Sequence, residues 1–297
     1  MKTQTAESPA RGKAKESIMK GVFTVSACIS ILAVALICVF LFANGLPAIA
    51  EIGPLKFLLG QKWAPSSNLY GILPMILGSI YLTAGALVVG VPIGLLTAIY
   101  MSRFAGKTTN KILTPAVQLL AGIPSVVYGF FGMMVLVPLI EPIARRYSGK
   151  GQSLFTASLL LGIMILPTII TVAKTSLDAV PQSYYEGSLA LGATHERSVF
   201  CTILPAAKSG VLAGIVLGVG RAIGETMAVI MVAGNQPRMP KGIFQGLRTM
   251  TSNIVIEMGY AADLHREALI ATGVVLFVFI LIINFSFSAI KGRDNNA

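Results

Sequence analysis

The sequence predicts an all-α membrane protein with six transmembrane helices. Of the 297 residues, 55% are hydrophobic and only 12% are charged, whereas soluble domains carry about 25% charged residues. Six apolar runs reach the roughly 20 residues that a helix needs to cross a bilayer. These runs cover residues 22–43, 72–101, 112–140, 152–173, 209–234 and 268–290.

The chain begins with a basic segment and the first span. Residues 1–20 carry five lysines and arginines and are expected to form a disordered tail. The run 22–43 exceeds the apolar core of a signal peptide, which is about 7–15 residues long, so a retained helix is favoured over a cleaved leader. We therefore expect one transmembrane domain over residues 21–291, followed by a short tail at 292–297.

Prolines mark the next three spans. Pro92, Pro124 and Pro167 lie inside apolar runs, and each removes a backbone donor and predicts a kink. The backbone groups freed at these kinks must be satisfied by neighbouring helices. The runs 72–101 and 112–140 are also long enough to tilt or to include an interfacial turn.

Only the fifth run contains charged residues. Arg221 lies at the midpoint of 209–234, where a charge costs about 2.5–3.5 kcal/mol. Glu225 would lie one turn further, about 6 Å along nearly the same helix face. Such residues either line a path for a charged solute or form a structural salt bridge. Thr226 and Asn235 are further candidates for the path, although polar side chains in membrane helices also bond neighbouring helices.

The fifth run also carries a stripe of glycines. Gly210, Gly214 and Gly218 recur every four residues, and Gly220 and Gly224 add a second pair. Small residues at this spacing let helix backbones approach closely. The fifth helix is therefore expected at the centre of the bundle rather than facing lipid on all sides.

The distribution of basic residues predicts the orientation. An even number of spans puts both termini on one side, where the loops and tails carry thirteen lysines and arginines against nine on the other side. Because positive loops stay in the cytoplasm, both termini are expected there. These loops also account for the net charge of +11. We therefore expect the chain to be surrounded by membrane lipid and to bind no nucleic acid.

Motifs for catalysis, metal binding or nucleotide binding are absent from the sequence. The stretch AGKTT resembles the end of a phosphate-binding loop, but Met101 stands where that loop requires glycine. The three cysteines form no zinc or disulfide pattern, and His195 and His265 fall in loops on opposite sides. We expect no enzyme, no catalytic residue, no metal and no cofactor bound by this chain, so any nucleotide must bind elsewhere.

The loop between the fourth and fifth spans, residues 180–205, predicts two short helices. Ser183 and Glu186 have the spacing of a capping box, and Gly192 suits the C-terminus of that helix. Thr194 would cap a second helix that stops before Pro205. On these residues alone, the loop is a capped helical hairpin.

The spacing within this hairpin resembles the EAA loop of ABC importer permeases. In that family a glutamate and two alanines are followed by a glycine and then by an I-x-L-P sequence. Small residues replace the alanines here, and Thr202 replaces the isoleucine. The resemblance implies that the hairpin seats in a groove on an ATPase subunit and transmits its closure. The implied coupling residues are Glu186, Gly187, Ser188, Gly192, Leu204 and Pro205.

Longer segments are similar to the phosphate-importer permeases, more to their PstC type than to their PstA type. These segments read YGILPMILGS, AVPQSYYEGSLALGAT and GRAIGETMAVIMVAGN. The resemblance covers most of residues 60–290 and implies the MetI-like, type I ABC importer permease fold in a bacterial inner membrane. It implies phosphate import with Arg221 and Glu225 in the path. The implied partners are a PstA-type permease, two ATPase subunits and a periplasmic phosphate-binding protein.

Three alternatives remain open from the sequence. A permease for sulfate or molybdate would share the inner loop. An ion-coupled secondary transporter would more typically show two related halves, and a membrane enzyme would need a convergent catalytic set.

The outer loop 235–267 is basic, and either meets an acidic rim on a binding protein or is simply solvated. Its basic residues include Arg238, Lys241, Arg248 and Arg266.

Overall fold

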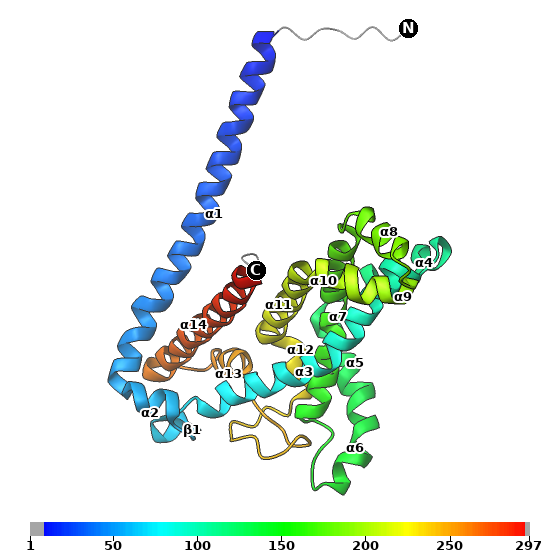
Figure 1. The fold of residues 1–297 in the computed structure, drawn as a ribbon. Coiled ribbons are helices and arrows are strands. Elements are labelled where there is room, and N and C mark those ends of the chain that lie inside the picture. Colours follow the sequence, from blue (N-terminus) through cyan, green and yellow to red (C-terminus); the bar gives the residue numbers. More distant parts are fainter. Residues whose placement is uncertain (1–8, 295–297) are drawn as a thin grey trace.

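The computed structural model describes residues 9–294, and its helices form a bundle with two distinct ends (Figure 1). At one end lie α8 (Gln182–Ala190) and α9 (His195–Ser198), and α14 (Asp263–Asp294) runs toward this end. We call it the hairpin end, and the opposite one the outer end. The outer end carries three short elements: α2 (Pro54–Leu59), β1 (Trp63–Ala64) and β2 (Leu69–Tyr70).

Several helices are long and apolar enough to cross a membrane. Within the described residues five single helices meet this condition, and a sixth crossing exists if a pair of helices bent by 71° counts as one span. The bent pair is His195–Ala206 with Lys208–Gly224. The single spans are Ile18–Ile52, Leu73–Phe104, Ser125–Arg146, Leu154–Asp178 and Asp263–Ser286. The expected all-α membrane architecture is confirmed, with two spans built differently from the prediction.

The third span is one of these two, and its expected boundaries of 112–140 are wrong. α4 (Lys107–Gly122) ends before Ile123, whose backbone is extended, and a new helix begins after Pro124. Proline disfavours helical backbone at the residue before it, so the predicted kink is a full break. The span itself consists of α5 (Ser125–Phe131), a π-helical turn (Gly132–Leu136) and α6 (Val137–Arg146).

The first helix, α1 (Pro9–Ile52), starts earlier than expected. Residues 9–20, for which we expected a disordered tail, continue the helix, because extending a helix costs less than nucleating one. Residues 1–8 of that tail lie outside the described residues. α14 likewise continues to Asp294, so the predicted tail at 292–297 begins as helix, and its last three residues lie outside the described range. α1 packs against α14, while its most apolar stretch is exposed.

The centre of the bundle is α7 (Leu154–Asp178). It packs against α3 (Leu73–Ile99) and α11 (Lys208–Gly224), and its buried side chains dominate the main hydrophobic core. Pro92 and Pro167 lie inside α3 and α7 without ending either helix. The central helices thus tolerate proline where close neighbours surround the backbone.

The glycine stripe of α11 faces α7, as predicted. A Cβ atom on Gly210 would lie 2.2 Å from Ser176 Oγ, and Cβ atoms on Gly214 and Gly218 would lie 3.2 and 3.1 Å from α7 side chains. The two helices can therefore approach this closely only because these three positions carry no side chain. The second glycine pair does not pack in this way within the described chain, since no atom lies within 4 Å of a Cβ placed on Gly220 or Gly224.

Candidate functional site

The fifth apolar run is broken at its charged residues. α11 ends at Gly224, Glu225 is extended (φ −70°, ψ 128°), and α12 (Met227–Val232) begins after Thr226. The prediction of one continuous helix over 209–234 is therefore wrong. Glycine is a poor helix former, and the polar residues that follow it bond the backbone groups that the break leaves without helical partners.

Glu225 and Thr226 bond to their own backbone segment. Glu225 Oε1 accepts hydrogen bonds from the N–H groups of Thr226 at 3.1 Å and Ala228 at 3.2 Å. Thr226 Oγ1 donates to the Gly224 carbonyl at 3.2 Å. The N–H groups at the start of a helix have no helical acceptor, so the carboxylate stabilises the beginning of α12. Both residues that we predicted to line a path therefore stabilise the break.

Arg221 is left without a carboxylate partner. It lies half-buried in the last turn of α11, and no ion pair joins it to Glu225 or to another acid among the side chains described between residues 16 and 286. Its hydrogen bond in the described chain runs from Nη1 to Thr168 Oγ1, at 3.4 Å. A guanidinium has five N–H donors, so most of them have no protein acceptor. The two charges form no salt bridge and do not share one helix face.

A second break lies close to the first. α5 packs against α12, and the approach is close because a Cβ atom on Gly129 would lie 2.9 Å from Ala228 Cα. The Tyr128 hydroxyl donates to the Leu120 carbonyl at 2.8 Å, across the break at Pro124. Irregular backbone at membrane depth is tolerated where protein buries it or where it lines a cavity. Arg221 therefore lies one turn before a backbone break that packs close to a second one.

The hairpin predicted over 180–205 is present. α8 ends as expected: Gly192 has φ +83°, its N–H donates to the Leu189 carbonyl at 2.9 Å, and the Ala193 N–H donates to the Ser188 carbonyl at 3.2 Å. This pattern is a Schellman motif. Thr194 Oγ1 accepts from the Arg197 N–H at 3.3 Å and caps α9, as predicted.

Two details of the hairpin differ from the prediction. Ser183 does not cap α8, because Pro181 is the N-cap residue and the helix already begins at Gln182. The second helix does not stop before Pro205. It continues through a π-helical turn (Val199–Ile203) into α10 (Leu204–Ala206), because proline is tolerated in a first helical turn.

The predicted coupling residues divide between exposed and inward positions. Ser188 is half-buried, and its Oγ accepts from Ser198 Oγ at 3.0 Å and from Thr202 Oγ1 at 3.4 Å. This residue therefore joins α8 to the second helix. Leu204 is also half-buried. The exposed coupling residues are Glu186, Gly187, Gly192 and Pro205. Leu191, which the prediction did not include, is 90% exposed beside them.

Sequence reasoning missed how the hairpin is anchored to the bundle. A π-helical turn (Tyr100–Phe104) follows α3, and its Ser102 Oγ donates to Asp178 Oδ1 at 2.5 Å. The ring of Phe104 meets His195 edge-on, with centroids 4.7 Å apart. These contacts connect the ends of α3, α7 and α9. They join residues more than seventy positions apart, so no local pattern indicated them.

A buried ionic cluster at the outer end was also missed. Glu257 Oε1 accepts from Arg248 Nη1 at 2.5 Å, while Oε2 lies 2.8 Å from His265 Nε2 and accepts from Trp63 Nε1 at 2.8 Å. The side chains of Arg248 and Glu257 are only 11% and 7% exposed. Burial raises the pKa of the neighbouring Tyr260 above its usual value, and the Glu257 carboxylate raises it further. This cluster connects β1, α13 (Met250–Glu257) and α14.

The cluster corrects the prediction for the outer loop. Arg248 is held in the ion pair with its side chain 11% exposed, and its Nε donates to the Asn235 carbonyl at 3.1 Å, so it is not part of an exposed docking surface. Asn235 has φ +49° and donates from Nδ2 to the Ile230 carbonyl at 2.7 Å, which ends the α12 segment. The other three basic residues of the loop, Arg238, Lys241 and Arg266, are exposed.

Comparison with known proteins identifies the family. Residues 90–293 match the model of the binding-protein-dependent transport system inner membrane component. The chain belongs to this family. It is therefore a multi-pass permease subunit of an inner membrane, and neither an ion-coupled secondary transporter nor a membrane enzyme.

Relatives cover nearly the whole chain. A probable ABC transporter permease protein, YqgH of Bacillus subtilis, is 38% identical over 279 residues, covering 90% of each chain. The phosphate transport system permease protein PstC of Haemophilus influenzae is 33% identical over 280 residues, covering 89% of each. The PstC protein of Mesorhizobium japonicum is 32% identical over 265 residues, covering 83% of this chain and 81% of its own. These similarities confirm the predicted resemblance to the PstC type.

Solved structures confirm the predicted fold. An inward-facing MetNI methionine ABC transporter has a TM-score of 0.54 at 20% identity, covering 81% of this chain and 98% of its own. A bacterial ABC transporter for alginate import has a TM-score of 0.59 at 14% identity, covering 93% of this chain and 99% of its own. At these identities the likeness concerns the fold, which is that of a MetI-like, type I ABC importer permease.

Proposed function

We propose that this chain is the membrane-spanning subunit of an ATP-driven importer of inorganic phosphate. The observation that carries the proposal is Arg221, a half-buried guanidinium beside a helix break with most of its donors unpaired. A guanidinium binds two phosphate oxygens at once and stays charged when buried. Relatives named as PstC permeases support phosphate as the solute.

Glu225 would then be a positioning residue rather than a counter-ion. Its Oε1 is held by the backbone at the start of α12, which keeps the negative charge away from an ion pair with Arg221. This arrangement leaves the guanidinium free for an entering anion. Thr226, bonded to the Gly224 carbonyl, would support the same geometry.

The first test is phosphate uptake by cells that carry Arg221→Gln in place of the native residue. Charge-assisted hydrogen bonds contribute about 1.5–3 kcal/mol, so we expect uptake to fall at least about tenfold while the complex still assembles. Arg146→Gln, which removes an exposed cation at the end of α6, is the matched control and should transport normally. Normal uptake by the Arg221 variant would refute the role, and loss of assembly would assign the arginine to structure. Competition by sulfate and molybdate tests the alternative oxyanions.

The hairpin is the proposed docking element for the ATPase. Its exposed residues include the small Gly187 and Gly192, the apolar Leu191 and the charged Glu186, which a groove on a partner can contact. The complete importer would contain a second permease of the PstA type, two ATPase subunits and a periplasmic phosphate-binding protein. The hairpin and both termini would lie in the cytoplasm, and ATP hydrolysis would occur on the partner subunits, with no cofactor held by this chain.

The outer loop is the proposed contact for the phosphate-binding protein. Arg238, Lys241 and Arg266 remain exposed there and would face an acidic rim or attract the anion. Because exposed charges are screened by salt, docking should weaken as ionic strength rises. Docking that is independent of salt would remove this part of the proposal.

A further inference from the structure

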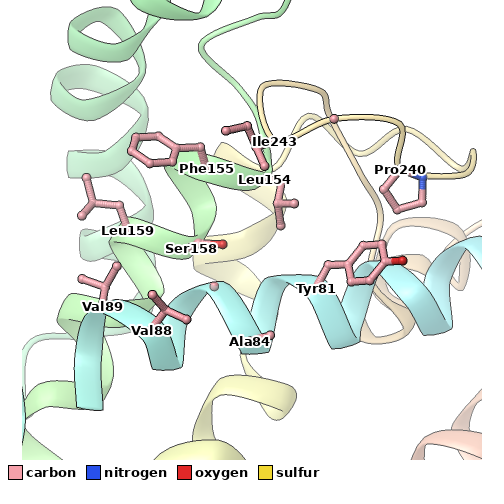
Figure 2. A pocket seen from close by; sticks show the side chains of 12 residues that line it. Tyr81, Ala84, Val88, Val89, Leu154, Phe155, Ser158, Leu159, Pro240 and Ile243 are labelled. Atoms are coloured by element: carbon pink, nitrogen blue, oxygen red, sulfur yellow. The ribbon is translucent and has the colours of Figure 1, made fainter. Parts of the chain in front are cut away.

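A cavity with apolar walls opens between α3 and the first turns of α7 (Figure 2). Its volume is about 500 Å³, within the range of about 300–1,000 Å³ that is typical of ligand sites. The main apolar contributors are Tyr81, Val88, Leu154, Phe155, Leu159 and Ile243.

The position of the cavity within the span indicates its surroundings. Residues 154–159 form the first turn and a half of α7, which is long and apolar enough to cross a membrane, so the cavity lies near one end of that span. The loop above it is fixed, because the Phe155 N–H donates to the Ile243 carbonyl at 2.8 Å. Val88, on its α3 wall, is 74% exposed. Bilayer lipid therefore has access from the side.

One polar side chain within the cavity lacks a partner. Ser158 is 6% exposed, and its Oγ makes no hydrogen bond to any described residue. Figure 2 shows this hydroxyl between the two helices, below the loop that carries Pro240 and Ile243. A buried hydroxyl without a partner is unfavourable, so an acceptor oxygen on a ligand would be bound here.

Cations border the mouth of the cavity. Lys241 is exposed and lies between two lining residues, Pro240 and Gly242. Lys150 is also exposed, and its N–H donates to the carbonyl of Phe244, next to the lining residue Ile243. The site thus combines apolar walls and one unpaired hydroxyl with two exposed cations on the segments beside it.

We propose that this cavity binds an anionic glycerophospholipid. One acyl chain lies between α3 and α7, an ester oxygen accepts from Ser158, and the phosphate lies near Lys241 and Lys150. The apolar, ester and anionic groups of such a lipid match the apolar walls, the unpaired hydroxyl and the neighbouring cations. Each cation near an anionic headgroup contributes about a fivefold preference.

Photo-crosslinking of the intact importer tests this assignment. The complex is reconstituted into vesicles that contain a trace of either phosphatidylglycerol or phosphatidylcholine with a photoreactive acyl chain. We expect adducts on the residues lining the cavity to be at least fivefold more abundant with phosphatidylglycerol. Adducts at Val39, which is 65% exposed on α1, report bulk lipid and should show no headgroup preference.

Variants of the rim distinguish a built site from ordinary lipid contact. Lys241→Gln should lower the phosphatidylglycerol preference at the cavity about fivefold, whereas Lys62→Gln, an exposed outer cation that does not line the cavity, should leave it unchanged. As a second measurement, native mass spectrometry should detect one retained phosphatidylglycerol, which Val88→Trp displaces by filling the cavity. Equal labelling by both lipids would overturn the proposal. A cavity without adducts would also overturn it and indicate that a protein segment fills the space.

Discussion

Two charged side chains in this bundle, Glu257 and Arg221, differ in how many partners they have. The Glu257 carboxylate is bonded by Arg248, His265 and Trp63, whereas Arg221 has one long hydrogen bond to Thr168. A buried charge is costly unless it is paired and hydrogen-bonded. The first group is therefore a structural anchor of the outer end, whereas most donors of the second have no protein acceptor in the described chain.

Removing the negative charge of the outer cluster should destabilise the protein. Glu257→Gln leaves the Arg248 guanidinium buried without its counter-ion, and breaking such a pair costs about 3–5 kcal/mol. We expect a clear fall in the midpoint of thermal unfolding in detergent. Glu267→Gln, which changes an exposed acid near the start of α14, should leave the midpoint unchanged. Equal midpoints for both variants would show that the cluster contributes little.

At the scale of single elements, glycines on one helix have opposite surroundings. Gly210 faces Ser176 of α7, while Gly220 faces open space within the described chain. The same substitution therefore has opposite expected effects at two positions of α11.

Gly210→Ala should separate α7 from α11. Its Cβ atom would lie 2.2 Å from Ser176 Oγ and 2.5 Å from Ser176 Cβ, and such overpacking typically costs about 1–3 kcal/mol. Gly220→Ala should instead leave the stability unchanged or raise it, because alanine favours helix by about 1 kcal/mol over glycine. Thermal unfolding of both variants measures the difference. A stable Gly210 variant would mean that the helices are not in close contact.

A second pair of glycines tests the hairpin. Gly192 has φ +83°, a conformation that costs other residues about 1–2 kcal/mol, so Gly192→Ala should loosen the end of α8 and lower ATP-driven uptake. Gly187→Ala lies in open helical surroundings and should stabilise α8 without loss of uptake. If both variants transport normally, the geometry of the turn does not matter for coupling.

Elements with a strong local signal were predictable, and those decided by tertiary contacts were not. The long apolar runs, the glycine stripe and the turn at Gly192 followed from composition and backbone preference. The break at Gly224 did not, because an apolar window gives no sign that Glu225 will bond to the backbone beyond it. The capping box at Ser183 failed because Pro181 already begins the helix.

The candidate site was predicted only in part. Arg221 was identifiable as a charge within an apolar run, but its lack of a partner depends on the course of the backbone after Gly224. The pairing of Arg248 with Glu257 brings together residues nine positions apart on different elements. No regular helix or strand spacing predicts such a pair. The positions of charged residues in the sequence therefore identify candidate site residues. Only the fold shows which of these charges are paired and which are not.

The whole molecule has two chemically different ends. The hairpin end exposes small and apolar residues together with charges of both signs, and the outer end presents the basic loop and the ionic cluster. This polarity fits a subunit that contacts different partners on the two sides of a membrane.

Labelling of single cysteines tests the proposed orientation. In a chain whose native Cys28, Cys38 and Cys201 are replaced by serine, we expect Lys241→Cys to react with a membrane-impermeant thiol reagent added outside the inner membrane. Leu191→Cys should react only after the membrane is opened. The reverse pattern would invert the topology.

The bend of 71° at Ala207 has a mechanical consequence. Because the hairpin and α11 do not share an axis, sideways force on the hairpin applies torque to α11 instead of pushing it lengthwise. The seventeen residues of α11 form a lever arm of about 25 Å, with Arg221 near its far tip. A small rotation at this bend is therefore magnified into a larger displacement of the guanidinium.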